Sequence, residues 1–145
     1  MASSTCLTKF PDLAYMTEQN RITEAILAQL SKEILKRDQI GNILNYPIEF
    51  PMKLIEEISL LTALKYWNEQ ITYTEGDYIM NNLFAYSVTR DSIDISCWFL
   101  SIAWECYLAF DSGEFYRDND DRSIDPSEKY TRPLVKSLLK KQKLI

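Results

Sequence analysis

The sequence predicts an all-α fold, a single-domain bundle of five to six helices around a buried aromatic helix at about residues 92–110. Three observations support this prediction. The chain has 145 residues, a length typical of one domain, and 46% of them are apolar. It contains three glycines and five prolines, too few for the turns of a hairpin-dense β fold. Apolar residues also recur at helical spacing along most of the chain.

The first helix is predicted from an apolar stripe and from the residues that flank it. One face of a 3.6-residue period carries Ile22, Ile26, Leu27, Leu30 and Ile34. Thr17 or Asn20 can cap the start of this helix, and Gly41 is a suitable end.

The second and third helices are each predicted from residues that are typical of a helix start. Pro51 suits the first turn of a helix, where its missing N–H is not needed, and the apolar stripe that follows ends near Trp67. The segment Thr74-Glu-Gly-Asp77 has the threonine and the carboxylate of a capping box, which predicts a third helix that stops before Arg90.

The fourth helix is predicted to form the core. Ser92 can cap it, and residues 93–110 include two tryptophans, two phenylalanines and one tyrosine. A helix that is apolar on nearly all sides is surrounded by other helices. Glu105 lies inside this segment, and we expect it to be exposed or paired with a lysine or arginine. Gly113 suits the C′ position that ends the helix.

The last helix is predicted to be amphipathic and basic, over residues 129–145. Asp125-Pro-Ser-Glu128 matches a capping box with proline at the first helical position. Thr131 and Pro133 then predict a second cap and a break. The expected buried stripe of the final helix consists of Leu134, Leu138 and Leu139.

The net charge of −5 is unevenly distributed. Residues 1–110 carry 14 acidic and 8 basic residues, residues 111–128 carry 7 and 2, and residues 129–145 carry 6 basic residues and no acidic one. The short acidic segment 111–128 therefore has as much net negative charge as the whole chain. It reads as a loop or turn segment within the single domain.

Three interpretations of this acidic segment are open. It can be a solvated loop whose carboxylates cap helices. It can be a calcium loop, but an EF-hand register starting at Asp118 places Arg122, Ser123 and Lys129 at positions 5, 6 and 12, where the pattern fails. It can be a docking surface for a basic partner, with carboxylates for steering and aromatic residues as anchors. The candidate partner-binding residues are Asp111, Glu114, Phe115, Tyr116, Asp118, Asp120, Asp121 and Asp125.

The residues that most enzymes use are scarce. The chain has no histidine, which removes the commonest general base and zinc ligand. It has no glycine-rich nucleotide-binding motif, and the carboxylate pairs Glu56-Glu57 and Asp91/Asp94 are expected to be structural rather than catalytic. The sequence predicts a protein that is not an enzyme and that has no cofactor or metal.

Three cysteines, Cys6, Cys97 and Cys106, are too scattered for a disulfide framework, and we expect them to be reduced. Cys97 and Cys106 are nine residues apart on one predicted helix, too far to pair. The N-terminal residues lack the pattern of a signal peptide, and the longest uncharged apolar-rich stretch, residues 95–104, is too short to span a bilayer. These features predict a cytoplasmic protein without a membrane contact.

The C-terminal third resembles a known group of proteins. The segments WECYLAFDSGEFYRDNDD (104–121) and DPSEKYTRPLVKSLL (125–139) resemble small helical immunity proteins encoded beside bacterial polymorphic toxins, with contact-dependent growth inhibition systems as the closest group. The resemblance implies a stoichiometric inhibitor that binds its cognate toxin domain in the cytoplasm. Many such toxins are basic nucleases, which suits an acidic inhibitor.

Two alternative functions remain open at this point. One is a small metal-dependent enzyme whose site is built from carboxylates. The other is a helical adaptor or regulator that uses the C-terminal helix, with Lys136, Lys140, Lys141 and Lys143, on nucleic acid, although the acidic balance of the chain disfavours direct nucleic-acid binding.

Overall fold

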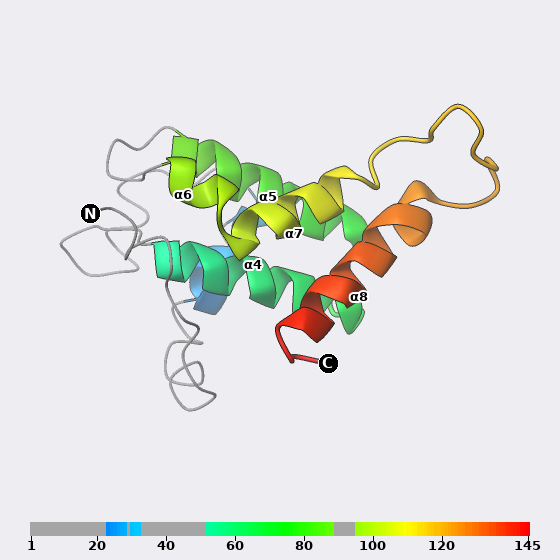
Figure 1. The fold of residues 1–145 in the computed structure, drawn as a ribbon. Helices are drawn as coiled ribbons and strands as arrows, with labels where there is room; N and C mark the ends of the chain where they lie inside the picture. Colours follow the sequence, from blue (N-terminus) through cyan, green and yellow to red (C-terminus); the bar gives the residue numbers. More distant parts are fainter. Residues whose placement is uncertain (1–22, 29, 33–51, 89–94) are drawn as a thin grey trace.

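The computed structural model describes residues 23–28, 30–32, 52–88 and 95–145, and the secondary structure of these residues is helical without a strand (Figure 1). Residues 23–28 and 30 are helical. The later elements are α4 (Met52–Trp67), α5 (Tyr73–Val88), α6 (Ile95–Phe99), α7 (Ile102–Asp111), the π-helical segment η1 (Ser127–Thr131) and α8 (Arg132–Lys141). The predicted all-α bundle is confirmed. Within the described ranges, no helix has the length and apolar character needed to cross a membrane.

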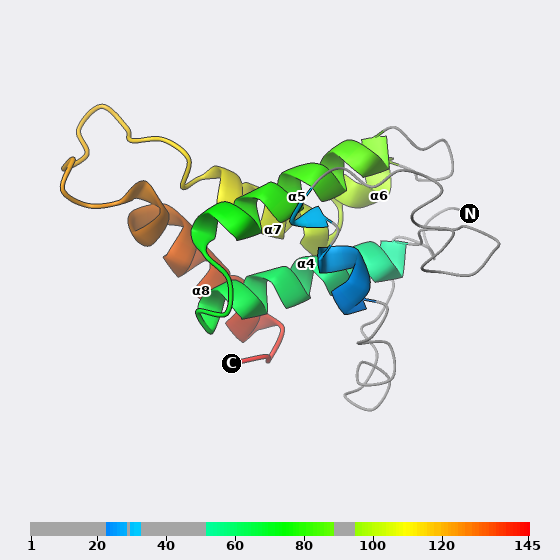
Figure 2. The same cartoon turned by 180° about the vertical axis from the view of Figure 1, so that it is seen from behind.

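The helices pack around α4 and α7. The helices α4 and α5 run in opposite directions, and α7 packs against both of them (Figure 1). The last helix, α8, packs against α4 and α7. Seen from behind, the short helix that contains residues 23–28 lies beside α4 (Figure 2). The core therefore consists of the facing sides of α4, α5, α7 and α8, to which the first helix adds Ile26, Leu27 and Leu30 and α6 adds Trp98.

The described part of the first helix is tied to the bundle by its buried stripe and by polar contacts. Ile26, Leu27 and Leu30 are buried, as predicted. The Asn82 side-chain amide of α5 donates a hydrogen bond to the Leu30 carbonyl at 2.7 Å, and Lys65 of α4 forms an ion pair with Glu24. The predicted ends of this helix, at Thr17 or Asn20 and at Gly41, lie outside the described residues, as do Ile22 and Ile34.

The end of α4 is a Schellman motif with an unusual residue. The helix starts at the residue after Pro51 and ends at Trp67, as predicted. The Gln70 N–H then donates to the Lys65 carbonyl at 2.8 Å, and the Glu69 N–H donates to the Tyr66 carbonyl at 3.0 Å. Glu69 occupies the left-handed C′ position, with φ 60°, where glycine is favoured.

Replacing Glu69 by glycine is expected to raise the free energy of unfolding by about 1 kcal/mol, because glycine has no Cβ to oppose the left-handed conformation. Urea unfolding followed by circular dichroism measures this change. Asn68→Gly is the matched control, since Asn68 does not have a positive φ. Equal stabilisation by both substitutions would show that the conformation of Glu69 is not strained.

The start of α5 lies two residues before the predicted one. The prediction of a capping box at Thr74 and Asp77 is wrong, because Thr72 and Glu75 form it. Thr72 Oγ1 accepts a hydrogen bond from the Glu75 N–H at 3.1 Å, and Glu75 Oε1 accepts one from the Thr72 N–H at 3.3 Å. Both segments fit the capping pattern, and a tertiary contact favours the first. Tyr73, the first residue of α5, donates from its hydroxyl to the Phe110 carbonyl at 2.6 Å.

The single aromatic helix predicted at 92–110 is wrong, because the described part is two helices. Ser101 has an extended backbone (φ −102°, ψ 164°) between α6 and α7, and its hydroxyl donates to the Trp98 carbonyl at 2.8 Å. Leu100 is 76% exposed. The break lets Trp98 enter the core while Leu100 points to solvent. The predicted cap, Ser92, lies outside the described residues.

An aromatic cluster forms around Phe84 of α5. Its ring lies 5.3 Å from that of Trp98, 5.8 Å from that of Trp104 and 4.9 Å from that of Tyr107. Trp104 and Tyr107 stack on each other at 5.3 Å. The prediction that this aromatic segment is buried on nearly all sides is confirmed for Trp98, which is fully buried, but not for Trp104, which is half-buried, or Phe99, which is 49% exposed.

The predicted break at Thr131 and Pro133 is also wrong. The segment η1 continues directly into α8, and the Arg132 N–H donates to the Ser127 carbonyl five residues earlier. Pro133 has no N–H to donate, and the wider π-helical turn directly before it allows the helix to continue. Thr131 acts as a contact to α7 instead, since its hydroxyl donates to the Ala109 carbonyl at 2.7 Å.

The buried face of α8 differs by one residue from the predicted stripe. Leu138 and Leu139 are buried as expected, but Val135 takes the place of Leu134, which is 46% exposed. Because η1 and α8 form one continuous helix, no break after Thr131 changes which residues of α8 face the core.

The cysteines Cys97 and Cys106 differ in oxidation state. Cys106 is free and buried, its thiol donates to the Ser59 carbonyl at 3.5 Å, and burial raises its pKa. The prediction that all three cysteines are reduced is wrong for Cys97, which is disulfide-bonded. Cys97 and Cys106 do not pair with each other, as their spacing predicts.

Candidate protein-binding loop

The acidic loop, residues 112–125, connects the end of α7 to the start of the C-terminal helix and projects from one end of the bundle (Figure 1). Gly113 lies at its base, where the chain passes close to η1. A Cβ at Gly113 would overlap Thr131 Oγ1 and lie 2.8 Å from Ser127 Cα. Gly113 does not have a positive φ. The predicted glycine is therefore required here for a close approach and not for a left-handed C′ conformation.

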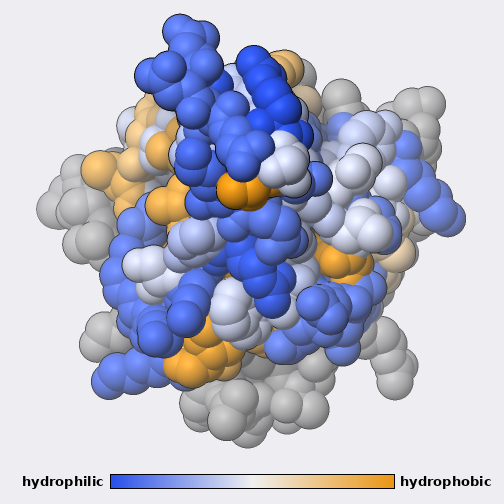
Figure 3. All heavy atoms as spheres, turned by 90° about the vertical axis from the view of Figure 1, so that its right-hand side faces the viewer, coloured by the Kyte–Doolittle hydropathy of each residue, from blue (hydrophilic) through white to orange (hydrophobic). Residues whose placement is uncertain are grey.

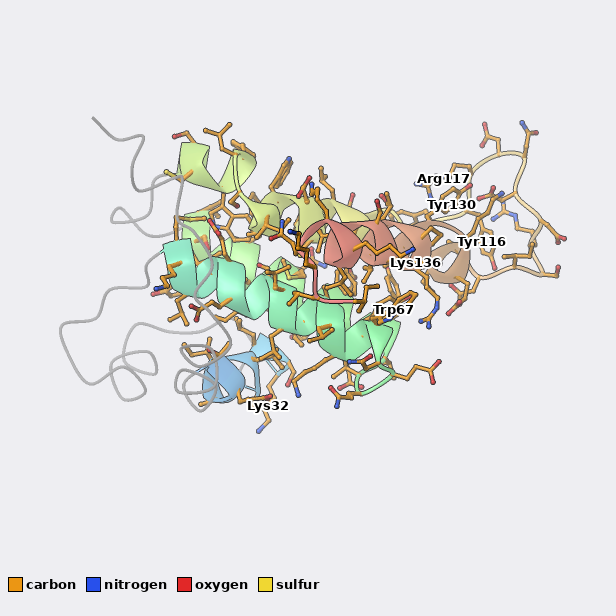
Figure 4. All side chains as sticks on the ribbon, turned by 60° about the horizontal axis from the view of Figure 1, so that its bottom comes forward. Lys32, Trp67, Tyr116, Arg117, Tyr130 and Lys136 are labelled. Carbon is orange, nitrogen blue, oxygen red and sulfur yellow. The ribbon has the colours of Figure 1, made fainter. Side chains whose placement is uncertain are left out.

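Arg117 holds the two limbs of the loop together. Its guanidinium carbon lies 3.6 Å from the centre of the Tyr130 ring, and Nη1 donates to the carbonyls of Ser112 at 2.6 Å and Phe115 at 3.0 Å. Figure 4 shows Arg117 and Tyr130 side by side where the loop meets the C-terminal helix. Sequence reasoning missed Arg117, and the signal that could have found it is that it is one of only two basic residues in the acidic segment 111–128, the other being Arg122.

Asp120 is the second internal support of the loop. Its Oδ1 accepts hydrogen bonds from Lys129 Nζ and the Tyr130 hydroxyl, both at 2.6 Å, and its Oδ2 accepts one from the Arg117 N–H at 2.7 Å. These bonds hold the pKa of Asp120 well below its usual range. The side chain is only 6% exposed. Asp120 was a predicted partner-binding residue, and the structure places it inside the loop.

Three further predicted residues also support the local structure. Asp121 Oδ1 accepts hydrogen bonds from the Ser123 N–H and hydroxyl, and Asp125 Oδ1 does the same with Ser127. These bonds lower the pKa of both carboxyl groups. The Tyr116 hydroxyl donates to the Arg122 carbonyl at 3.1 Å. Asp121 and Asp125 remain exposed, so their negative charge still contributes to the surface.

The remaining candidates face outward to different degrees. Phe115 is 73% exposed, and Asp111 and Asp118 are exposed on either side of it in sequence. Glu114 is half-buried beside Asp77 of α5. The face at this end of the molecule is mainly hydrophilic, with hydrophobic residues in separate small areas (Figure 3).

Asp77 and Glu114 form a pair of neighbouring carboxyl groups at the base of the loop. Burial, followed by the charge of Glu114, a hydrogen bond with Glu114 and the charge of Asp111, raises the pKa of Asp77 to about 7. Burial, followed by the same carboxylates, also raises the pKa of Tyr73 and of Tyr107. Sequence reasoning missed Asp77 as part of this group, because only the fold brings α5 next to the loop.

Replacing Asp77 by asparagine is expected to stabilise the protein by about 1–2 kcal/mol at pH 8, after allowance for solvent screening. The pKa of Asp77 is raised from 3.8 to about 7 in the folded state. The stabilising contribution of the Asp77 carboxyl group to the free energy of unfolding is therefore fully present below pH 3.8 and is lost as the pH rises through about 7. Urea unfolding at pH 5 and pH 8 measures the difference, and a gain of equal size at both pH values would contradict this assignment.

Three of the other carboxylates weighed as candidates, Glu56, Glu57 and Glu105, lie in the described residues. Glu105 forms an exposed ion pair with Lys141 at 2.6 Å, as predicted. Glu56 and Glu57 are both buried in α4, and burial, followed by the charge of Glu57, raises the pKa of Glu56 to about 7. Asp91 and Asp94 lie outside the described residues. No group of three or more histidine, cysteine, aspartate or glutamate residues in the described part of the chain is arranged to hold a metal ion.

Comparison with known proteins yields no relative. No protein-family model, curated protein or solved structure matches the chain.

Proposed function

We propose that this protein is an immunity protein that binds and neutralises a cognate bacterial toxin domain, a basic nuclease, by covering its substrate surface. The observation that carries the proposal is an acidic loop that is braced by contacts of Arg117 and Asp120 with Tyr130 of η1 and that exposes Phe115 among carboxylates. The resemblance of residues 104–121 and 125–139 to immunity proteins supports the same function.

The bracing of the loop favours tight binding. Arg117, Asp120 and Tyr130 hold the loop in one conformation before any partner arrives. A preorganised loop loses less conformational entropy on association than a flexible one. The same three residues keep Phe115 outside the loop, where an aromatic side chain can act as the buried anchor of an interface.

The charge of the loop supplies the specificity for a basic partner. In the proposed complex, Asp111 and Asp118 face lysine or arginine side chains that otherwise bind the phosphates of the nucleic acid. Substrate and inhibitor then compete for the same cations. Complementary charge also speeds the association of the two proteins, so the toxin is inhibited before it cleaves nucleic acid.

The test uses the product of the neighbouring gene, which the proposal takes to be the toxin. Phe115→Ala is expected to weaken binding by about 30-fold, or about 2 kcal/mol, measured by titration calorimetry. Asp118→Asn is expected to weaken binding less and to make it less sensitive to salt. Glu105→Gln is the matched control, because Glu105 is an exposed carboxylate of α7 whose ion pair with Lys141 lies outside the loop.

Two results would contradict the proposal. Unchanged affinity of Phe115→Ala would show that the loop is not the binding surface, and absence of binding to the adjacent toxin domain would refute the immunity function. The binding assay includes a reductant, because the proposed place of action is the cytoplasm, where the disulfide at Cys97 would be reduced.

A further inference from the structure

An apolar groove of about 260 Å³ lies between α7 and α8, next to the base of the acidic loop. Its apolar lining consists of Leu108, Ala109, Leu134 and Leu138. Leu108 is 41% exposed and Leu134 is 46% exposed, so two large apolar side chains of the groove are open to solvent. Exposed apolar residues in a concave surface mark an interaction site. Because a cavity of about 150 Å³ accepts benzene, the groove has room for one aromatic side chain.

The helix that forms one wall of the groove is strongly basic. Residues 129–145 carry six basic residues and no acidic one. Lys141 lines the groove, and Lys140 is exposed beside it in the last turn of α8. Lys141 pairs with Glu105, but both side chains are largely exposed, and such a surface ion pair can exchange partners at little cost. The groove therefore favours an occupant that is apolar at its centre and acidic around it.

The acidic loop of this chain has both properties. Phe115 is 73% exposed, and Asp111 and Asp118 are exposed before and after it in sequence. The groove of the same copy does not hold this loop, because all of its lining residues belong to α7 and α8. The basic toxin domain of the proposed function is a poor occupant, since the lysines of α8 repel it. The remaining candidate is the loop of a second copy.

We propose that the protein forms a two-fold symmetric dimer in which Phe115 of each copy inserts into the groove between α7 and α8 of the other. The carboxylates beside Phe115 then face Lys140 and Lys141 of the second copy. In an isologous dimer of this kind every contact occurs twice. The bracing of the loop in the free protein reduces the conformational entropy that is lost when the dimer forms.

The position of the groove allows this exchange to be reciprocal. Ser112, the first residue of the loop, donates from its N–H and its hydroxyl to the Leu108 carbonyl. Thr131, three residues before Leu134, donates to the Ala109 carbonyl. The loop and the groove therefore lie side by side at the end of the bundle where α7 and α8 meet the loop (Figure 1). A two-fold axis that passes between them places each loop on the groove of the other copy.

The dimer and the proposed toxin complex exclude each other, because both bury Phe115. In the absence of toxin the dimer covers this exposed ring, and a toxin domain that binds more tightly displaces the second copy. The dimer itself does not depend on the identity of the toxin, so the inference goes beyond the proposed function.

Sedimentation velocity across a range of protein concentrations tests the dimer. A monomer–dimer equilibrium with a dissociation constant on the order of 10 μM is expected, since small interfaces are weak. Added salt is expected to weaken the dimer, because opposite charges face each other in it. A reductant is present throughout, so that no disulfide between copies contributes. A protein that stays monomeric at about 1 mM would overturn the proposal.

Variants on the two sides of the interface locate it. Phe115→Ala removes the anchor and Leu134→Gln makes the groove polar, and each is expected to raise the dissociation constant of the dimer more than about 30-fold, because two contacts are lost. Leu100→Gln is the matched control. Leu100 is a 76% exposed leucine outside the groove, and its replacement is expected to change the constant less than about twofold.

A mixture of the two interface variants gives the sharpest result. The Phe115→Ala copy keeps an intact groove and the Leu134→Gln copy keeps an intact anchor, so a mixed dimer retains one of the two contacts. We expect the mixed dimer to form at concentrations where neither variant dimerises alone. Absence of the mixed dimer, or equal weakening by Leu134→Gln and Leu100→Gln, would overturn the interface. Oligomers that grow beyond a dimer would overturn its two-fold arrangement.

The dimer and the proposed function fail in different experiments. Leu134→Gln leaves the whole loop unchanged and is expected to bind the toxin domain at least as tightly as the unaltered protein, because no dimer competes. Toxin binding by a protein that never dimerises would remove the dimer alone. A dimer that forms as described without any binding of the toxin domain would remove the proposed function and keep the interface.

Discussion

Replacing Phe110 by alanine is expected to lower the free energy of unfolding by about 4 kcal/mol, which is the largest effect of a single substitution that we predict. Phe110 is fully buried. Its ring contacts Tyr66 edge-on at 5.3 Å, and a Cβ on Gly76 would overlap it. The ring thus packs directly against the backbone of α5, and the neighbouring helices cannot close the cavity that its removal leaves.

Urea unfolding monitored by circular dichroism measures this loss, and Phe115→Ala provides the matched control. Phe115 lies five residues later and is 73% exposed, so its removal is expected to change the free energy of unfolding by less than about 0.5 kcal/mol. The two phenylalanines should therefore separate stability from the proposed toxin binding. A similar destabilisation by both substitutions would contradict the assignment of Phe115 to the surface.

Replacing Gly113 by alanine is expected to destabilise the protein by about 3 kcal/mol. The new Cβ would overlap Thr131 Oγ1 and lie too close to Ser127 Cα, which belongs to the backbone and cannot rotate away. Displacement of Thr131 would also break its 2.7 Å hydrogen bond to the Ala109 carbonyl. This bond ties α7 to η1 at the base of the acidic loop, so we expect the proposed toxin binding to weaken as well.

Ser112→Ala is the control for Gly113→Ala. Ser112 is half-buried, and its hydroxyl donates only to the Leu108 carbonyl within its own helix, at 2.7 Å. Its removal is expected to cost less than about 1 kcal/mol in urea unfolding. A loss below 1 kcal/mol for Gly113→Ala would mean that the loop base can open to accept a methyl group, against the close packing seen here.

The acidic loop shows what a charge pattern in the sequence can predict and what it cannot. The sequence located the segment and identified its candidate residues, because composition along a chain is visible without a fold. It did not separate the carboxylates with internal partners from those that face solvent. Asp120 and Asp118 are two residues apart and chemically identical, and they differ because Lys129, Tyr130 and the Arg117 N–H surround Asp120 alone.

The sequence by itself determined the helical class of the protein, the start of α4 after Pro51 and the end of that helix at Trp67. These features depend on short-range rules such as backbone geometry, apolar spacing and capping, which act within a few residues. The break at Ser101, the start of α5 at Thr72 rather than Thr74, and the continuous helix through Thr131 were decided by the tertiary structure. In these places the local sequence patterns allow more than one solution, and contacts such as Tyr73 to Phe110 and Thr131 to Ala109 accompany the one that forms.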